Sequence, residues 1–341
     1  MLFNEADIDI SEIKPNFVPE TPACYSKPFD IDLSLTALPK ETTPDIVYQT
    51  HFKELKETKY AGFQEFYTDG SKKDERTSYA VKHDFGLCCH RIRDHASIFT
   101  AETEGLKRAL RFTLAIPRAR GKFVIFSDSK SVLESLENYN SKNVIVKECL
   151  DLIYKIIKLK RTISLCWIPG HAGIEGNELA DQGAKRTLRR EIAPQFLLPY
   201  QDLYPVVNAF VKQRWQERWD TSHARRPIKL HYIQPVLSPF KITGLSRKEE
   251  CVYHRLRIGH TRLTHKYLFE QRGPNKIPPL CHFCNDPEEN LTVEHLLIDC
   301  YEFYPVRPRH YYAPDLNYLF NNISPKQILG FLKEVNLFKE I

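Results

Sequence analysis

The chain has 341 residues, of which 27% are charged and 42% hydrophobic, a balance typical of folded globular proteins rather than disordered ones. This length allows about two domains. No stretch of about 18 consecutive apolar residues occurs, and the acidic N-terminal segment lacks the apolar core of a secretory signal. We therefore expect no membrane span and an intracellular protein, nuclear or cytoplasmic. Its nine cysteines are then expected to be thiols or metal ligands rather than disulfides.

Charge is distributed unevenly along the chain. The net charge is +6, but residues 1–60 carry six Lys against eleven Asp and Glu, whereas residues 201–280 carry fifteen Lys and Arg against six acids. A basic segment of this kind suits a polyanionic partner such as nucleic acid. A solvated basic surface would have the same composition, so charge alone leaves both interpretations open.

Three regions differ in their sequence patterns. Residues 1–60 contain proline at short intervals and little periodicity, which predicts an extended acidic arm or linker, with a short helix near residues 47–57. Residues 61–192 alternate strand and helix patterns and are expected to form one domain. Residues 193–341 lose the strand patterns, which predicts a mostly helical basic region.

The middle region predicts a sheet covered by helices. Short alternating or apolar runs indicate strands, at residues 63–69, 79–83, 85–89, 123–126 and 163–167. Apolar residues at three- and four-residue steps indicate helices, at residues 100–115, 128–136, 144–159 and 177–190. The first three strands follow one another, whereas helices separate the others. This order predicts an α/β fold with a mixed five-stranded sheet flanked by helices.

Four acids stand at the ends of these predicted elements. Asp69 ends the first strand and Asp128 follows the fourth, while Glu102 and Asp181 lie in the first turns of two helices. Functional groups collect at the carboxyl ends of neighbouring strands in an open sheet, and crowded carboxylates need cations, of which Mg²⁺ is the usual partner. Taken singly, each acid is also explained as a turn residue, a helix cap or a surface charge.

The residues around these acids form four motifs in a fixed order, which are Tyr67–Ser71, Thr100–Glu102, Phe126–Ser129 and Trp167–Asp181. With them the chain resembles the type 1 ribonuclease H family over about residues 62–190. It is most similar to the domain that follows reverse transcriptase in non-LTR retrotransposons. One departure is Thr103, where the family usually has Leu. Thr103 lies beside the site and is not one of the four acids, so the departure leaves the motif intact.

The resemblance implies a function and a set of site residues. Asp69, Glu102, Asp128 and Asp181 occupy the positions of the family's metal-binding acids, and His171 that of a mobile histidine thought to assist metal exchange or product release. The implied activity is endonucleolytic hydrolysis of the RNA strand of RNA–DNA hybrids with two Mg²⁺ or Mn²⁺ ions. The alternative is a nucleic-acid-binding retroelement remnant without nuclease activity, and the intact acids favour the enzyme.

A cysteine and histidine cluster follows in the C-terminal region, within residues 281–300. Cys281, Cys284, His295 and Cys300 have the spacing C-x2-C-x10-H-x4-C. Three thiolates and one imidazole predict a closed, structural Zn²⁺ site, although four unrelated residues with buried thiols would give the same pattern. The cluster also resembles the CCHC motif found downstream of ribonuclease H in non-LTR elements. The basic stretch before it, residues 254–267, suits either phosphate contacts or a solvated helix face.

Overall fold

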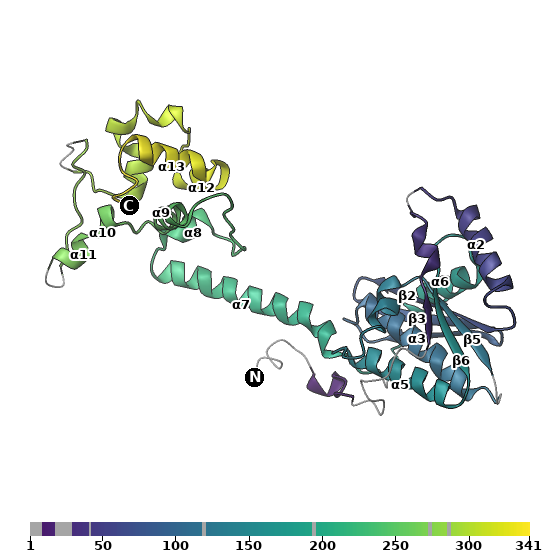
Figure 1. The fold of residues 1–341 in the computed structure, drawn as a ribbon. Helices are drawn as coiled ribbons and strands as arrows, with labels where there is room; N and C mark the ends of the chain where they lie inside the picture. Colours follow the sequence, from purple (N-terminus) through teal and green to yellow (C-terminus); the bar gives the residue numbers. More distant parts are fainter. Residues whose placement is uncertain are drawn as a thin grey trace. The chain divides into compact units, whose positions relative to one another are not determined.

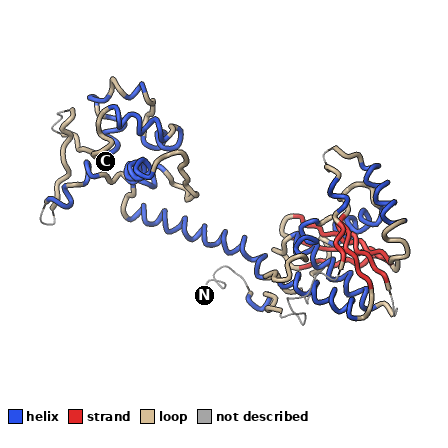
Figure 2. The backbone as a smooth tube through the Cα atoms, in the orientation of Figure 1, coloured by secondary structure: helices blue, strands red, loops and turns tan. Residues whose placement is uncertain are grey.

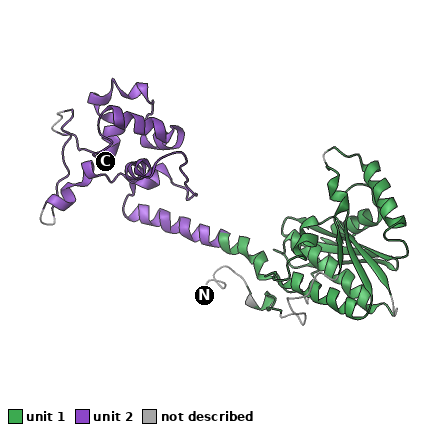
Figure 3. Cartoon of the chain, viewed as in Figure 1, with its two compact units in different colours: residues 1–208 green, residues 209–341 purple. Residues whose placement is uncertain are grey.

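The computed structural model divides into two compact units, residues 1–208 and 209–341, which Figure 3 shows in separate colours. The structure describes seven segments, which are residues 9–17, 29–40, 42–117, 121–192, 196–271, 275–284 and 288–341. Residues 1–8 and 18–28 of the predicted acidic arm lie outside these segments. Among the described residues, no helix is long and apolar enough to cross a bilayer.

The N-terminal unit is built on one mixed sheet of six strands in the order β1-β6-β5-β2-β3-β4 (Figures 1 and 2). Strands β2 (Gln64–Lys73), β3 (Arg76–His83) and β4 (Gly86–Ile92) form an antiparallel meander. Strands β5 (Lys122–Ser127) and β6 (Thr162–Trp167) run parallel to β2. All five predicted strands are therefore present in one mixed sheet.

The expected count of five strands is wrong by one, because β1 (Asp30–Asp32) adds a parallel edge strand beside β6. Three residues with two acids and one isoleucine carry no alternation that could reveal a strand. The predicted arm differs in a second way, since residues 29–60 pack onto the domain. They contain the 3₁₀ helix η2 (Ser34–Ala37) and α2 (Asp45–Glu57), near the short helix expected at 47–57.

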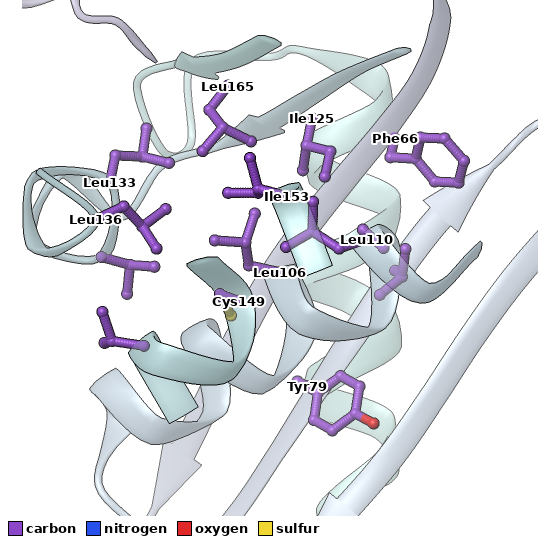
Figure 4. Packing of buried hydrophobic residues seen from close by; sticks show 14 of the residues in the cluster. Phe66, Tyr79, Leu106, Leu110, Ile125, Leu133, Leu136, Cys149, Ile153 and Leu165 are labelled. Atoms are coloured by element: carbon purple, nitrogen blue, oxygen red, sulfur yellow. The ribbon is translucent and has the colours of Figure 1, made fainter. Parts of the chain in front are cut away.

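Helices cover both faces of the sheet. On one face lie α3 (Ile98–Ala115), α4 (Lys130–Ser135) and α5 (Val144–Lys158), which pack on alternate strand residues. Figure 4 shows the centre of this core, where side chains of α3, α4 and α5 meet those of β2, β5 and β6. On the opposite face, α2 and α6 (Glu175–Thr187) pack on the remaining strand residues.

Local sequence explains where the two long core helices begin. The Ser97 hydroxyl accepts a hydrogen bond from the Thr100 amide at the start of α3, and the Asn143 side chain accepts bonds from two amides at the start of α5. Such caps satisfy backbone donors that a helix leaves unpaired. The cap at Ser97 fixes the first turns of α3, from which Glu102 projects.

The C-terminal unit is helical, and its named elements include no strand among the described residues. It begins within α7 and continues through short helices around a core of its own. These are α7 (Tyr204–Arg225), α8 (Lys229–Ile233), α9 (Arg247–Ile258), α10 (Arg262–His265), α11 (Tyr267–Glu270), α12 (Leu316–Asn322) and α13 (Pro325–Glu334). The π-helical turn η4 (His295–Asp299) carries His295 of the cysteine and histidine cluster.

Candidate functional site

Strand pairing brings the first two acids together. Strands β2 and β5 are parallel neighbours, and their last paired residues are Thr68 and Ser127. Each is followed by an acid, Asp69 and Asp128. Asp128 comes just after β5, as predicted, whereas Asp69 does not end its strand, because β2 continues to Lys73 in its pairing with β3. Because the two strands are parallel and paired up to this point, the two acids come at the same level of the sheet, and the charge of Asp128 contributes to raising the pKa of Asp69.

Helices on both faces of the sheet supply the other two acids, Glu102 from α3 and Asp181 from α6. Glu102 reaches the sheet edge because Gly70 follows Asp69. A Cβ atom at Gly70 would lie 2.8 Å from Glu102 Cγ. Gly170 is equally confined, since a Cβ there would lie 2.6 Å from Asp128 Oδ2. Glycine at these two positions therefore makes room for the acids.

Burial and mutual repulsion oppose the ionisation of these acids. Burial raises the pKa of Asp69 to about 8, with further contributions from Asp128 and Asp181. Burial also raises the pKa of Glu102 to about 7, against the lowering effect of a hydrogen bond from Ser129. The pKa of Asp128 is likewise raised by burial, although a hydrogen bond from Asn177 opposes the shift. The site therefore favours a bound cation, which would relieve this repulsion.

Several neighbours of the acids were not singled out from the sequence. The Ser129 hydroxyl donates to Glu102 Oε2 at 2.5 Å, and the Lys185 ammonium group donates to Asp181 Oδ2 at 2.6 Å. Lys185 could have been found from its position four residues after Asp181, on the same face of α6. Ser129 had a weaker signal, because adjacency to Asp128 does not reveal a contact with another helix.

His171 lies on the loop that precedes α6, in the left-handed region with a φ of 59°. Its side chain is 67% exposed, and its Nδ1 lies 4.0 Å from Asp181 Oδ2. His171, Glu178 and Asp181 each offer a metal-ligating atom, and these three atoms lie within 4.8 Å of one another. Glu178 is a further residue that the sequence reasoning missed, although it stands three residues before Asp181 on α6.

The predicted zinc ligands converge in the C-terminal unit. One ligating atom each from Cys281, Cys284, His295 and Cys300 lies within 4.8 Å of the others, and all four residues are buried. The Sγ atoms of Cys281 and Cys300 are 4.0 Å apart, and Cys284 Sγ lies 3.5 Å from His295 Nε2. This arrangement is compatible with a tetrahedral zinc site.

The chemistry around this Cys3His cluster also suits a metal. Burial raises the pKa of the Cys300 thiol to about 12, with a further contribution from Cys281. Such thiols stay protonated unless a cation replaces the proton. The second ring nitrogen of His295, Nδ1, lies 3.7 Å from a carboxylate oxygen of Glu289. A carboxylate that accepts a hydrogen bond from the far nitrogen often supports a metal-bound histidine. Here the distance is too long for such a bond, and among the described residues Nδ1 has no hydrogen-bond partner.

Comparison with known proteins finds a family match within the N-terminal unit. Residues 63–189 match the family model described as RNase H. The chain is 26% identical over 217 residues to the Gag-Pol polyprotein of bovine immunodeficiency virus (strain R29), which covers 62% of this chain and 13% of the polyprotein. Among solved structures, RNase H1 from the halophilic archaeon Halobacterium salinarum NRC-1 matches with a TM-score of 0.30 and 18% identity. That match covers 38% of this chain and all of the archaeal chain.

Residues 63–189 therefore carry an RNase H domain, which confirms the resemblance drawn from the four motifs. The chain spans about an eighth of the length of the polyprotein that it matches. The non-LTR retrotransposon context and the assignment of the Cys3His cluster to a CCHC segment stay predictions.

Proposed function

We propose that this protein is an endonuclease that hydrolyses the RNA strand of RNA–DNA hybrids. The observation that carries this proposal is the convergence of Asp69, Asp128, Glu102 and Asp181 at one edge of the sheet, where the pKa of Asp69 is raised to about 8. Four acids placed together in this way would only destabilise the fold if they had a purely structural role, because burial and mutual repulsion oppose their ionisation. The RNase H match over residues 63–189 supports the same activity.

The donor set of the acid cluster fits a pair of Mg²⁺ or Mn²⁺ ions. Carboxylate oxygens are the ligands that these hard cations prefer, together with water and phosphate oxygens. When bound, two such ions activate a water as the nucleophile and neutralise the leaving 3′ oxygen, which gives 5′-phosphate and 3′-hydroxyl products. In this proposal Asp69, Glu102, Asp128 and Asp181 are the metal ligands.

The chain's own residues hold this site in shape. The Ser129 hydroxyl orients the Glu102 carboxylate, and Lys185 orients that of Asp181. His171 is exposed beside Asp181 and is not a ligand in this account. Its position beside Asp181 suits the role in metal exchange or product release that the resemblance implies.

The C-terminal unit has a separate role in this proposal. Cys281, Cys284, His295 and Cys300 hold one structural Zn²⁺ ion, because four protein ligands leave no open coordination position. We assign residues 61–192 to the nuclease domain and residues 193–341 to a helical basic region, both derived from a retrotransposon and acting inside the cell.

The proposal is tested by substrate choice. The full chain, purified without chelator, is incubated with a labelled RNA–DNA hybrid, double-stranded RNA or double-stranded DNA of the same sequence, with Mg²⁺ or with excess EDTA. We expect cleavage of the hybrid alone, and only with Mg²⁺. Binding of the hybrid without cleavage in either Mg²⁺ or Mn²⁺ would instead identify a nucleic-acid-binding remnant.

A further inference from the structure

A basic pocket in the C-terminal unit lies outside both metal clusters. It has a volume of about 760 Å³ and is lined by residues of α9, α10 and α11 and by the segment after α13. Four of its lining residues are Lys or Arg, whereas Glu340 is the one acid among the lining residues that the structure describes. We infer that this pocket binds single-stranded nucleic acid, as a site separate from the nuclease site.

The cations of the pocket are available to a ligand. Arg262 and Lys339 are exposed and make no ion pair with the part of the chain that the structure describes. Lys266 is also exposed, although its ammonium group pairs with Glu270 at 2.6 Å. Arg255 is held in place by a hydrogen bond from its Nη1 to the backbone oxygen of Ile341 at 3.0 Å. Phosphodiester groups are the ligands that such a cluster attracts.

Aromatic rings stand beside these cations. His260 and His265 stack with their ring centroids 3.6 Å apart, and Phe269 is 87% exposed. Burial, with His260 and Lys229, lowers the pKa of His265 to about 4, so its ring is neutral at physiological pH. An exposed phenylalanine costs hydration free energy unless a partner covers it. Bases stack on such rings, and stacking next to cations is the usual mode of single-strand binding.

The dimensions of the pocket favour a single strand over a duplex. A volume of about 760 Å³ falls within the range of about 300–1,000 Å³ typical of sites for small ligands. Individual unstacked nucleotides therefore fit into the pocket, whereas the bases of a duplex are paired and cannot enter. The pocket would recognise a phosphodiester group next to an unpaired base, and single strands of both RNA and DNA provide these groups.

The test measures binding apart from catalysis. Fluorescein-labelled single-stranded DNA and RNA oligonucleotides of mixed sequence are titrated with the full chain without added Mg²⁺ and without chelator, so that any zinc in the C-terminal unit is kept. The binding constant is followed by anisotropy over a series of salt concentrations. We expect the double variant R262E/K339E to bind at least tenfold more weakly than the wild type. Loss of two phosphate contacts should also reduce the slope of log K against log salt by about 1.4.

The matched control is K241E/R247E, which also reverses two exposed charges of the same unit, both outside the pocket. It should bind within about twofold of the wild type, and the milder R262Q/K339Q should weaken binding in the same direction as R262E/K339E. Equal loss of affinity in K241E/R247E and R262E/K339E would overturn the inference, because the two variants have the same net charge and only that charge would then matter. Hybrid cleavage at saturating substrate is measured in parallel, so failure of the nuclease proposal is seen separately.

A second inference concerns α2, which lies outside the residues that match the RNase H model. Gln49 of this helix donates a hydrogen bond from Nε2 to the backbone oxygen of Ala172 at 2.9 Å. Gly173 follows with a φ of +71°, and a Cβ there would lie 2.5 Å from Gln49 Nε2. The geometry points to Gln49 as a positioning residue that tethers the loop carrying His171.

The tether is anchored in the core. The neighbouring Tyr48 and Phe52 are buried, and the Phe52 ring packs edge-on to Phe126 of β5 at a centroid distance of 5.0 Å. This packing fixes α2 on the sheet, so the Gln49 side chain restrains the loop from a fixed helix. The restraint matters because His171 has a positive φ, a conformation that residues other than glycine rarely adopt without support. The inference rests on the proposed function only for its effect on turnover.

Hydrogen exchange tests this tether without any activity. Q49L removes the donor, Q49E keeps the size but replaces the donating amide with a carboxylate, and E54A on the next turn of α2 is the control. Amides of residues 170–176 should exchange at least about tenfold faster in Q49L and Q49E but not in E54A. If the nuclease proposal holds, multiple-turnover cleavage should change in these two variants while single-turnover cleavage does not. Unchanged loop exchange in both Gln49 variants would contradict the inference.

Discussion

At the scale of single residues, Asp69 is the acid of the cluster whose pKa is raised by all three of the others. Burial raises its pKa most, and the charges of Asp128, Asp181 and Glu102 raise it further. We expect Asp69→Asn to lower hybrid cleavage by about a thousandfold or more, equivalent to about 4 kcal/mol, because it removes an anionic metal ligand. Asp128→Asn should behave likewise.

The control for this loss is Asp74→Asn. Asp74 is an exposed residue of the turn between β2 and β3 with a φ of 56°, a conformation that Asn tolerates. It should cleave as the wild type does, and circular dichroism should show all three variants folded. Near wild-type turnover of Asp69→Asn at physiological Mg²⁺ would contradict the proposed metal site.

His171→Ala is expected to slow turnover by about 10- to 100-fold without abolishing it, the usual range for residues that support a metal site without being ligands. The imidazole Nδ1 lies 4.0 Å from Asp181 Oδ2, too far for a hydrogen bond but close enough to influence that ligand. Steady-state cleavage and Mg²⁺ titration check this together. Complete loss of metal binding in the variant would show that His171 is a ligand.

The raised pKa of Asp69 makes the stability of the metal-free protein depend on pH. Unfolded Asp ionises near pH 3.9, whereas folded Asp69 does so near pH 8, so the folded state holds an extra proton between these values. Stability should therefore fall as pH rises through this window and level off above pH 8. In EDTA we expect Tm to drop by about 5 °C or more from pH 5 to pH 8.5.

Two comparisons isolate the cause of this pH dependence. The asparagine of Asp69→Asn cannot ionise, so the Tm of this variant should depend less on pH than that of the wild type. Because both proteins contain the same histidines, the difference between their Tm profiles excludes the contribution of histidine titration. Added Mg²⁺ should restore the wild-type Tm at pH 8.5. An identical pH profile in wild type and Asp69→Asn would show that Asp69 is not destabilised by its neighbours.

The four acids could be singled out as candidate site residues from the sequence because the motifs around them are local. Each of Asp69, Glu102, Asp128 and Asp181 stands within a run of residues that identifies its element. The supporting contacts were not predictable in this way. Gln49 and Ala172 are 123 positions apart, and only the packing of α2 on the sheet brings them together.

At the scale of elements, the same limit explains the missing strand. The five predicted strands show apolar alternation or an apolar run, whereas β1 has a single apolar residue, Ile31, and depends on its pairing with β6. A short parallel edge strand is stabilised by its neighbour and by long-range contacts. One such contact is the hydrogen bond from Tyr60 to Asp32 at 3.0 Å. Tyr60 and Asp32 are 28 positions apart, so no local sequence pattern predicts this contact.

The Cys3His cluster gives the prediction at this scale. If one Zn²⁺ joins its four residues, binding free energy contributes to folding of this segment. Cys284→Ser should release the zinc and speed hydrogen exchange across residues 275–305, while Cys251→Ser, an exposed cysteine on α9 outside the cluster, should do neither. Hybrid cleavage should survive in both variants, because the acids belong to the other unit.

Metal analysis of the purified wild type completes this test. About one equivalent of zinc is expected under reducing, chelator-free conditions. Less than about half an equivalent would reject the zinc site, and the buried thiols would then be part of an apolar core.

At the scale of the whole molecule, each compact unit has its own hydrophobic core and its own cluster of side chains that could hold a metal ion. The acids of the proposed nuclease site all come from the N-terminal unit, and the basic pocket and the Cys3His cluster from the C-terminal unit. Because the two sets share no residue, substitutions in one unit should leave the chemistry of the other intact.

The central claim is that the acid cluster cuts RNA within a hybrid, and one measurement tests it most directly. The RNA and DNA strands of a hybrid carry different labels, and the wild type, Asp69→Asn and Asp74→Asn are incubated with it in Mg²⁺ and resolved on a denaturing gel. We predict cleavage of the RNA strand alone, with 3′-hydroxyl ends, by the wild type and Asp74→Asn and none by Asp69→Asn. An intact RNA strand with folded wild-type protein, or equal cleavage by Asp69→Asn, would contradict the account.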